Sequence, residues 1–189
     1  MKRSILDAQT AFYTKNGFIE FEIPHPDVPF IPKRDQWRED ETLKTFILKN
    51  LGPISLVLAG KKQLRLAFSE WITEENRPKN RGFLKEMLSI QNLMLAVSIA
   101  PNPIIPTKKS PLGIIPLPTS AEQILFFRPT LILDWPCVLS PFFLILFTLS
   151  NGVYVHNNQD PQTTYLKELG YEYGDTLRAE THPLLFAQY

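Results

Sequence analysis

The fold is decided by residues 121–149, which read AEQILFFRPTLILDWPCVLSPFFLILFTL. Prolines divide this stretch into three short apolar runs, at Glu122–Arg128, Thr130–Asp134 and Phe142–Leu149. Apolar runs this short, bounded by turn residues, are typical of buried strands rather than helices. Several such strands in close succession predict a β-sandwich or a β-barrel.

The rest of the chain extends the same pattern toward the N-terminus. Further strands are predicted at Phe18–Ile23, Ile54–Ala59 and Leu88–Ala100. Residues 61–72 fit either periodicity, and we favour a strand because Leu64, Leu66 and Phe68 alternate with other residues. Seventeen prolines against eight glycines also favour many short elements joined by stiff turns.

Helices are expected around this sheet rather than within it. The first is predicted at Ser4–Asn16 and the second at Arg38–Asn50, where Leu51-Gly52-Pro53 should end it. Asp160-Pro161 is a good helix start. The sequence therefore predicts one α+β domain over 1–189, with flanking helices and a double-stranded β-helix (jelly-roll) core in 1–150 and a C-terminal helical extension over 151–189.

Composition excludes several classes of function. The formal net charge is +1, so no global field would attract nucleic acid or an anionic membrane. Cys137 is the single cysteine, which excludes an internal disulfide and a cysteine-rich zinc site. The long apolar region Leu131–Leu149 is interrupted by Asp134, Pro136 and Pro141, and the remainder is too short to cross a bilayer. The N-terminus also lacks the apolar core of a signal peptide, so we expect a cytoplasmic protein.

Histidine, the side chain best suited to acid–base and metal chemistry at neutral pH, is scarce. The three histidines are His25, His156 and His182, and none lies between residues 26 and 155, where most of the sheet is predicted. His25-Pro26-Asp27 has the form of the first half of an iron-binding triad, but it lies in a proline-rich loop ahead of the core. Neither a glycine-rich phosphate loop nor a nucleophile elbow is present.

Four segments together resemble one enzyme family. They are Asn16-Gly-Phe-Ile19 after the opening helix, Gly113-Ile-Ile-Pro-Leu-Pro-Thr-Ser120, Ala121-Glu-Gln-Ile-Leu-Phe-Phe-Arg-Pro-Thr-Leu-Ile-Leu133, and Ser140-Pro-Phe-Phe-Leu-Ile-Leu-Phe-Thr148. The sequence resembles the iron(II)- and 2-oxoglutarate-dependent oxygenases of the phytanoyl-CoA-dioxygenase-like kind, in a degenerate form. The resemblance covers most of residues 5–150 and implies a jelly-roll scaffold.

The departures from this family fall on its chemistry. The resemblance places Leu133 at the position of the distal iron-binding histidine, and leucine has no lone pair to give a metal. The other two ligands, a His-x-Asp/Glu pair, should lie just before or within the strand at 88–100, yet 76–102 contains neither histidine nor aspartate. Ser140-Pro141 stands where the family has the arginine that binds 2-oxoglutarate, and Ala121 where it commonly has a histidine.

The main hypothesis is therefore a non-catalytic jelly-roll protein without iron, 2-oxoglutarate or another cofactor. It would bind an unidentified small ligand or protein partner through the former active-site mouth. Residues such as Leu133 and Trp135 would make that vestigial pocket apolar. No membrane partner is expected, and nucleic acid is not expected either.

Two alternatives stay open at this point. The first is a divergent oxygenase that recruits His25, Asp27 and either His156 or His182 as relocated ligands. The second is a divalent-cation-dependent transcriptional repressor, which predicts a recognition helix, a basic face and a metal cluster. The sequence contains no convincing example of these three features.

Overall fold

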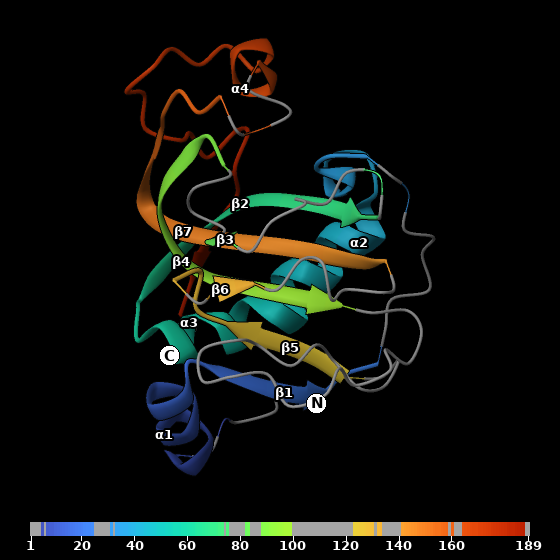
Figure 1. Ribbon diagram of the computed structural model, residues 1–189, viewed down its shortest axis with the longest axis vertical. Helices are drawn as coiled ribbons and strands as arrows, with labels where there is room; N and C mark the ends of the chain where they lie inside the picture. The colour runs from blue at the N-terminus through green and yellow to red at the C-terminus, as the bar shows by residue number, and fades with distance from the viewer. Residues whose placement is uncertain are drawn as a thin grey trace.

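The protein is represented by a computed structural model (Figure 1). The structure describes residues 5, 7–24, 31, 33–73, 75, 82–83, 88–99, 123–130, 132–133, 141–158, 160 and 164–187. The predictions for His25, Asp27, Trp135, Cys137 and the proline-rich segment 102–119 fall outside these ranges.

A six-stranded antiparallel sheet forms the centre of the molecule (Figure 1). Its strands lie in the order β1-β5-β4-β7-β2-β8. Their bounds are β1 Phe18–Glu22, β2 Gln63–Ile72, β4 Ile90–Ile99, β5 Gln123–Phe127, β7 Phe142–Tyr154 and β8 Leu184–Phe186. The strands predicted at 18–23, 61–72, 88–100, 122–128 and 142–149 are thereby confirmed, and β7 runs five residues beyond its predicted end.

The helices near the N-terminus include one that the sequence interpretation assigned to a strand. They are α1 Asp7–Asn16, the 3-10 turn η1 Gln36–Arg38, α2 Glu41–Phe46, the π-turn η2 Ile47–Leu51 and α3 Gly52–Ala59. The strand predicted at Ile54–Ala59 is wrong, because Gly52-Pro53 begins α3 instead of ending the preceding helix. Proline is tolerated in the first helical turn, where its missing N–H has no partner to lose.

Gly52 is required by packing rather than by turn geometry. A Cβ atom at this position would lie 2.1 Å from Cδ2 of Leu185, which belongs to β8. The glycine thus allows α3 to lie close against β8. The sequence analysis interpreted Gly52-Pro53 as the end of a helix and did not foresee this contact with Leu185.

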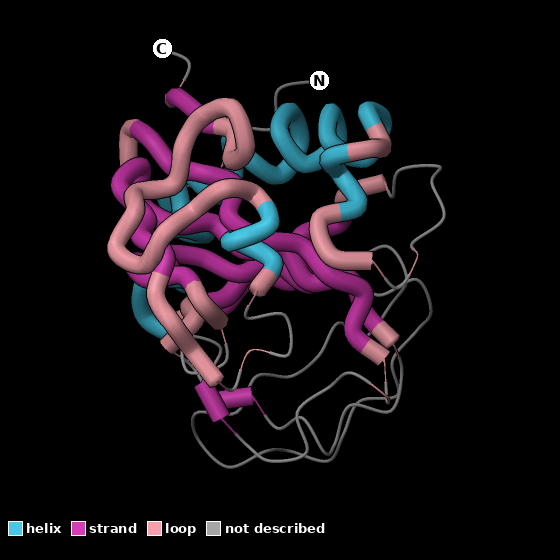
Figure 2. The backbone as a smooth tube through the Cα atoms, turned by 90° about the horizontal axis from the view of Figure 1, so that it is seen from above, coloured by secondary structure: helices cyan, strands magenta, loops and turns pink. Residues whose placement is uncertain are grey.

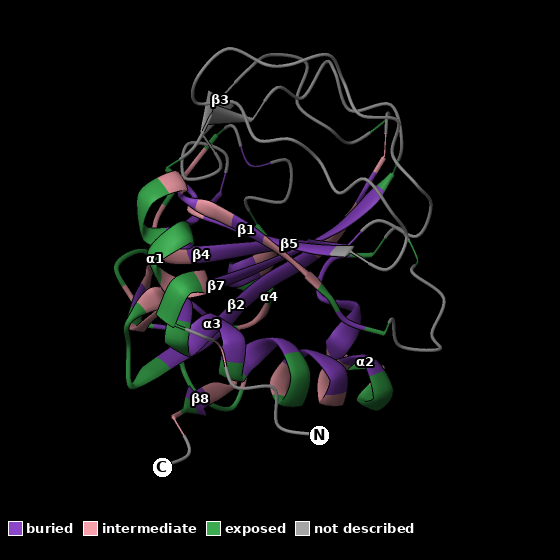
Figure 3. Cartoon of the chain, turned by 90° about the horizontal axis from the view of Figure 1, so that it is seen from below, coloured by how far each residue is buried: buried purple, intermediate pink, exposed green. Residues whose placement is uncertain are grey.

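The large sheet has two chemically distinct faces. One face packs against α2 and α3 through a core that includes Val97, Phe126 and Ile145, and we call it the helix face. The opposite face, which we call the inner face, includes Ala96, Leu125 and Leu144. A two-stranded sheet of β3 (Gly82–Phe83) and β6 (Ile132–Leu133) lies on the inner-face side (Figures 2 and 3). The short β6 confirms a strand within the predicted Thr130–Asp134 run.

The C-terminal region departs from the expected helical extension. Strand β7 continues through residue 150 to Tyr154, and α4 (Tyr165–Glu168) is one turn long. The chain ends on β8, which pairs with β2 at Gln63–Arg65. Gly170, two residues after the end of α4, has a φ of 78°. Within the described ranges, no helix is long and apolar enough to span a membrane.

A bulge in β7 depends on a glycine. The pairing of β4 with β7 shifts from Leu93↔Thr148 to Gln91↔Val153, so β7 contains extra residues here. The Thr148 hydroxyl is buried and lies 2.7 Å from the carbonyl oxygen of Asn92 and 3.0 Å from that of Gln91. Gly152 lies against this threonine, since a Cβ there would be 2.5 Å from its Cγ2.

We expect Gly152→Ala to destabilise the protein by about 1–3 kcal/mol, the usual cost of overpacking a buried site. Urea unfolding followed by circular dichroism measures this change. Adding Thr148→Ser to the variant removes the closest methyl group and should restore part of the loss. An unchanged unfolding midpoint in Gly152→Ala would contradict the assigned bulge geometry.

Candidate functional site

Leu133, which the family resemblance aligns with a metal ligand, lies in β6, and β6 pairs with β3. Leu133 pairs with Gly82, and Ile132 pairs with Phe83. The segment just before β4 and the predicted distal-ligand strand are therefore neighbours.

The residues at this pairing do not fit iron(II). An iron site of the expected type needs two imidazoles and a carboxylate converging on one point. Leu133, Gly82 and Phe83 offer no imidazole or carboxylate. Among all described residues, no group of three or more His, Cys, Asp and Glu side chains is arranged to hold a metal ion.

The two described histidines occupy different surroundings. His156 follows the end of β7 and is exposed. His182 precedes β8 and is fully buried. The relocated ligand set of the oxygenase alternative also includes His25 and Asp27, which lie outside the described residues.

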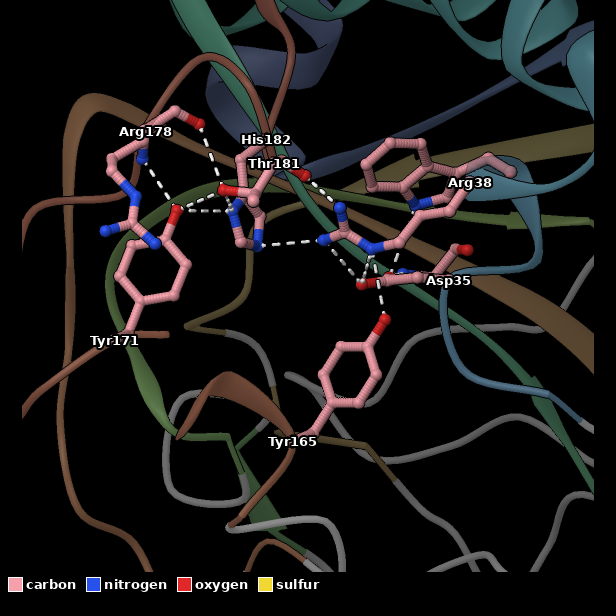
Figure 4. Close-up of polar contacts among 9 residues, drawn as sticks. Asp35, Arg38, Tyr165, Tyr171, Arg178, Thr181 and His182 are labelled. Carbon is pink, nitrogen blue, oxygen red and sulfur yellow. Dashed lines mark hydrogen bonds and ion pairs between the residues drawn. The ribbon is translucent and has the colours of Figure 1, made fainter. Parts of the chain in front are cut away.

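His182 is held in a hydrogen-bond network rather than presented to a ligand (Figure 4). Its Nε2 lies 3.2 Å from a guanidinium nitrogen of Arg38, which can only donate, so Nε2 accepts. In the neutral ring the proton is then on Nδ1, which lies 3.0 Å from both the Tyr171 and Thr181 hydroxyls. Tyr171 and Thr181 also bond to each other. Both ring nitrogens are thus engaged within the protein.

The surroundings keep this imidazole neutral. Burial, together with the charges of Arg38, Arg65 and Arg178, lowers the pKa of His182 to about 3. Arg65 also donates from its guanidinium to the His182 carbonyl oxygen at 2.6 Å. A neutral histidine whose two ring nitrogens are both hydrogen-bonded serves to fix the C-terminal segment. A metal would have to displace Arg38 to reach Nε2 of His182.

Arg38 joins η1 to the C-terminal segment. It donates to the Asp35 carboxylate, with NH2 at 3.1 Å from Oδ2, and to the carbonyl oxygen of Thr181. The other Asp35 oxygen accepts from the Trp37 indole at 3.2 Å and from the Ser69 backbone N–H at 2.8 Å. One carboxylate therefore connects the edge of β2, η1 and, through Arg38, the segment before β8. The sequence interpretation missed this cluster, because only tertiary pairing brings residues 35–38 to residue 181.

A buried ion pair between Arg34 and Asp160 holds a second part of the C-terminal region in place. Arg34 lies 3.1 Å from Asp160 through NH1 and Oδ1, and both side chains are less than a tenth exposed. Asp160 also accepts the Ser89 backbone N–H at 3.0 Å. The Arg34 guanidinium stacks 4.4 Å above the Phe68 ring, which belongs to the inner face.

The inner face carries polar residues in one row across the sheet. Directly paired residues of antiparallel strands point to the same face. Ser98 pairs with Leu125 on one side and with Leu144 on the other, and these pair in turn with Glu20 and Glu70. We call this set of residues the Glu20–Ser98–Glu70 row.

The row was also missed from sequence, for a specific reason. The sequence predicts a strand at Phe18–Ile23 but does not show which strands lie beside it or what Glu20 faces. The register instead places Glu20 on a face whose next row includes buried Phe127 and Leu146. The available signal was Ser98, which interrupts an otherwise apolar run from Leu93 to Ile99.

Comparisons with known proteins support the fold assignment. No protein-family model matches the chain, and no curated protein sequence matches it. Among solved structures, the chain is similar to the non-heme alpha-ketoglutarate-dependent carbocyclase SnoK from nogalamycin biosynthesis, with a TM-score of 0.70 and 12% identity over 96% of each chain. It is also similar to the epimerase SnoN in complex with Fe3+, alpha-ketoglutarate and nogalamycin RO, with a TM-score of 0.62 and 10% identity over 94% of this chain and 97% of that one.

These likenesses confirm an oxygenase-like fold, and at such low identity they concern the fold alone. The chlamydial protein CT296 from Chlamydia trachomatis aligns with 78% of this chain and 97% of its own, with a TM-score of 0.47 and 14% identity. That score is too low to support any argument.

Proposed function

We propose that this chain is a jelly-roll protein that binds a ligand on its inner face without iron or 2-oxoglutarate. The observation that carries the proposal is the β3–β6 pairing. It joins the two segments that should hold the metal, and at that pairing stand Leu133, Gly82 and Phe83. The described residues at this pairing supply no imidazole or carboxylate to a metal, and a scaffold of this fold can bind a ligand without oxidising it.

The network around His182 supports this proposal against the relocated-ligand alternative. A metal on His182 would have to replace the Arg38 bond at Nε2 or the hydroxyl bonds at Nδ1. Either change would leave a buried polar group without its partner, which costs about 1–3 kcal/mol before any metal bond forms. His156, the other described candidate, is exposed and belongs to no metal-holding group of three or more His, Cys, Asp and Glu side chains among the described residues.

The test is anaerobic calorimetry of the metal-stripped protein with iron(II), in the presence and absence of 2-oxoglutarate. We expect no saturable heat in either titration. One equivalent of iron(II), bound more tightly when 2-oxoglutarate is present, would overturn the proposal. The four histidine and aspartate positions of the alternative (His25, Asp27, His156 and His182) would then be the ligands to substitute.

A further inference from the structure

Helix α1 turns one side to solvent at the edge of the molecule. It lies next to β1, the edge strand of the large sheet, at one end of the protein (Figure 1). It contacts β1 and α3, and among the residues of α1 Tyr13 alone is buried. The opposite side is exposed (Figure 3). We call its central residues the α1 face, and they are Asp7, Ala8, Ala11, Phe12 and Lys15.

The α1 face is partly apolar. Phe12 is 47% exposed and packs edge to face on Phe18 of β1, with the ring centroids 6.0 Å apart. Ala8 and Ala11 lie beside it and are exposed as well. The distance between two packed helices depends on the side chains at the contact, and alanine allows a close approach. An exposed aromatic ring next to two alanines is therefore a surface that another helix can cover.

The charges of the α1 face are opposite in sign and symmetrically placed. Asp7 is in the first turn of the helix and Lys15 in the last. Within the part of the chain that the structure describes, neither side chain has an ion-pair or hydrogen-bond partner. Residues four apart lie on the same side of a helix, so Asp7, Ala11 and Lys15 form one ridge. Ala11 is its midpoint, and a copy of the ridge turned end for end complements it in charge.

We propose that the α1 face binds a second copy of this chain, with the two α1 helices antiparallel across a two-fold axis at Ala11. In this arrangement Asp7 of each chain meets Lys15 of the other. A two-fold interface uses the same surface on both chains, and packing of such i±4 ridges is the commonest class of helix contact. The proposal goes beyond the proposed function, because the inner face takes no part in it.

The size of the α1 face determines how strong this dimer is. A helix of 10 residues is about 15 Å long. Two helices of this length bury less than the roughly 1,200 Å² that a stable interface needs. The dimer is therefore weak, forms reversibly as the concentration rises, and weakens with salt because its ion pairs are exposed.

The experiment is sedimentation equilibrium of the full chain over a wide range of protein concentration, at low and at high salt. We expect a monomer–dimer equilibrium that salt shifts toward the monomer. Asp7→Lys places like charges at both ends of the paired ridges and should weaken the dimer about tenfold, and Lys15→Asp should do the same. Ala11→Gln places two larger side chains at the axis while keeping a good helix former, and it should weaken the dimer about tenfold as well.

A charge exchange separates pairing between chains from an effect within α1. Lysine at the start of a helix and aspartate at its end both oppose the helix dipole, so a role within α1 predicts that the two substitutions add. The dimer predicts that they cancel. The double variant Asp7→Lys with Lys15→Asp should recover the native association. An equimolar mixture of the two single variants should form a heterodimer, since one ridge is then wholly basic and the other wholly acidic.

Helix α2 provides the matched control. It carries the same arrangement, with Glu41 in its first turn and Lys44 in its last. Glu41→Lys and Lys44→Asp change the net charge by the same amounts as the two α1 variants and should leave the association unchanged. Circular dichroism of each variant checks that the chain is folded.

Three outcomes would overturn the proposal. The first is a monomer at every concentration and salt, which would leave the α1 face to a different partner. The second is a dimer that Asp7→Lys and Lys15→Asp do not weaken. The third is a loss of association that neither the double variant nor the mixture restores.

Discussion

Asp160→Asn should lower the free energy of unfolding by about 3–5 kcal/mol at pH 7, measured by urea denaturation. The amide keeps the shape of the side chain but removes the charge opposite Arg34, which is 7% exposed at its side chain. Breaking a buried ion pair from one side leaves an uncompensated charge in a medium that solvates it poorly. The same carboxylate holds the Ser89 N–H, so the segment entering β4 also loses an anchor.

An exposed pair provides the control. Glu41 lies 3.3 Å from Lys44, with side-chain exposures of 79% and 33%. Glu41→Gln should therefore cost no more than about 0.5 kcal/mol. The double variant Arg34→Met with Asp160→Leu should recover most of the stability, because apolar residues of similar size often replace a buried pair without loss. A cost below about 1 kcal/mol for Asp160→Asn would contradict the assignment of a buried pair.

Acidification should destabilise the protein through His182. The folded pKa of this residue is about 3, whereas an unfolded histidine titrates near 6.5. Between these two pH values the unfolded chain binds a proton that the folded chain does not. The contribution of His182 to stability is therefore complete above pH 6.5 and is lost as the pH falls toward 3. The slope approaches about 1.4 kcal/mol per pH unit, which gives roughly 2.5 kcal/mol by pH 4.5.

Carboxylates also take up protons as the pH falls from 6.5 to 3. The effect of His182 must therefore be measured by comparing the native protein with a variant that lacks this histidine. His182→Gln keeps an acceptor for Arg38 and a donor for Tyr171 but cannot take up a proton. Urea unfolding of both proteins from pH 7.5 to 4.5 should show the stability difference narrowing as the pH falls. Two parallel stability curves would show that His182 does not titrate as its burial requires.

Strands β1, β2, β4, β5 and β7 were predictable from sequence because each carries its own signal, whereas β3 and β8 were not predicted. The apolar runs at 122–128 and 142–149 read directly as β5 and β7. Gly52-Pro53 failed as a helix stop because its role depends on contact with Leu185, which lies more than a hundred residues away. The C-terminal helix was overestimated for a similar reason. Pairing with β2 and the bonds around His182 hold residues 181–187, and local propensity does not reveal either.

The candidate site was only partly predictable. The resemblance pointed to Leu133, which lies in β6 and pairs with Gly82, and its place in a pocket stays a prediction. The contribution of Trp135 to the pocket stays a prediction. The juxtaposition of Glu20 with Ser98 requires the register of three strands, which no local pattern contains. His182 was named as a possible ligand, but the three hydrogen-bond partners of its ring follow only from the packing of the C-terminal segment.

The edge of β2 that faces away from β7 bears on self-association. An open strand border offers unpaired N–H and C=O groups to another chain and promotes aggregation. Here β8 covers Gln63–Arg65, Leu66 donates to the Pro183 carbonyl oxygen, and Ser69 exchanges hydrogen bonds with Asp35. Two segments from distant parts of the chain thus cover this side of β2, and the strand left at the edge of the sheet, β8, is only three residues long. A short edge strand disfavours strand addition by a second copy, a task separate from ligand binding.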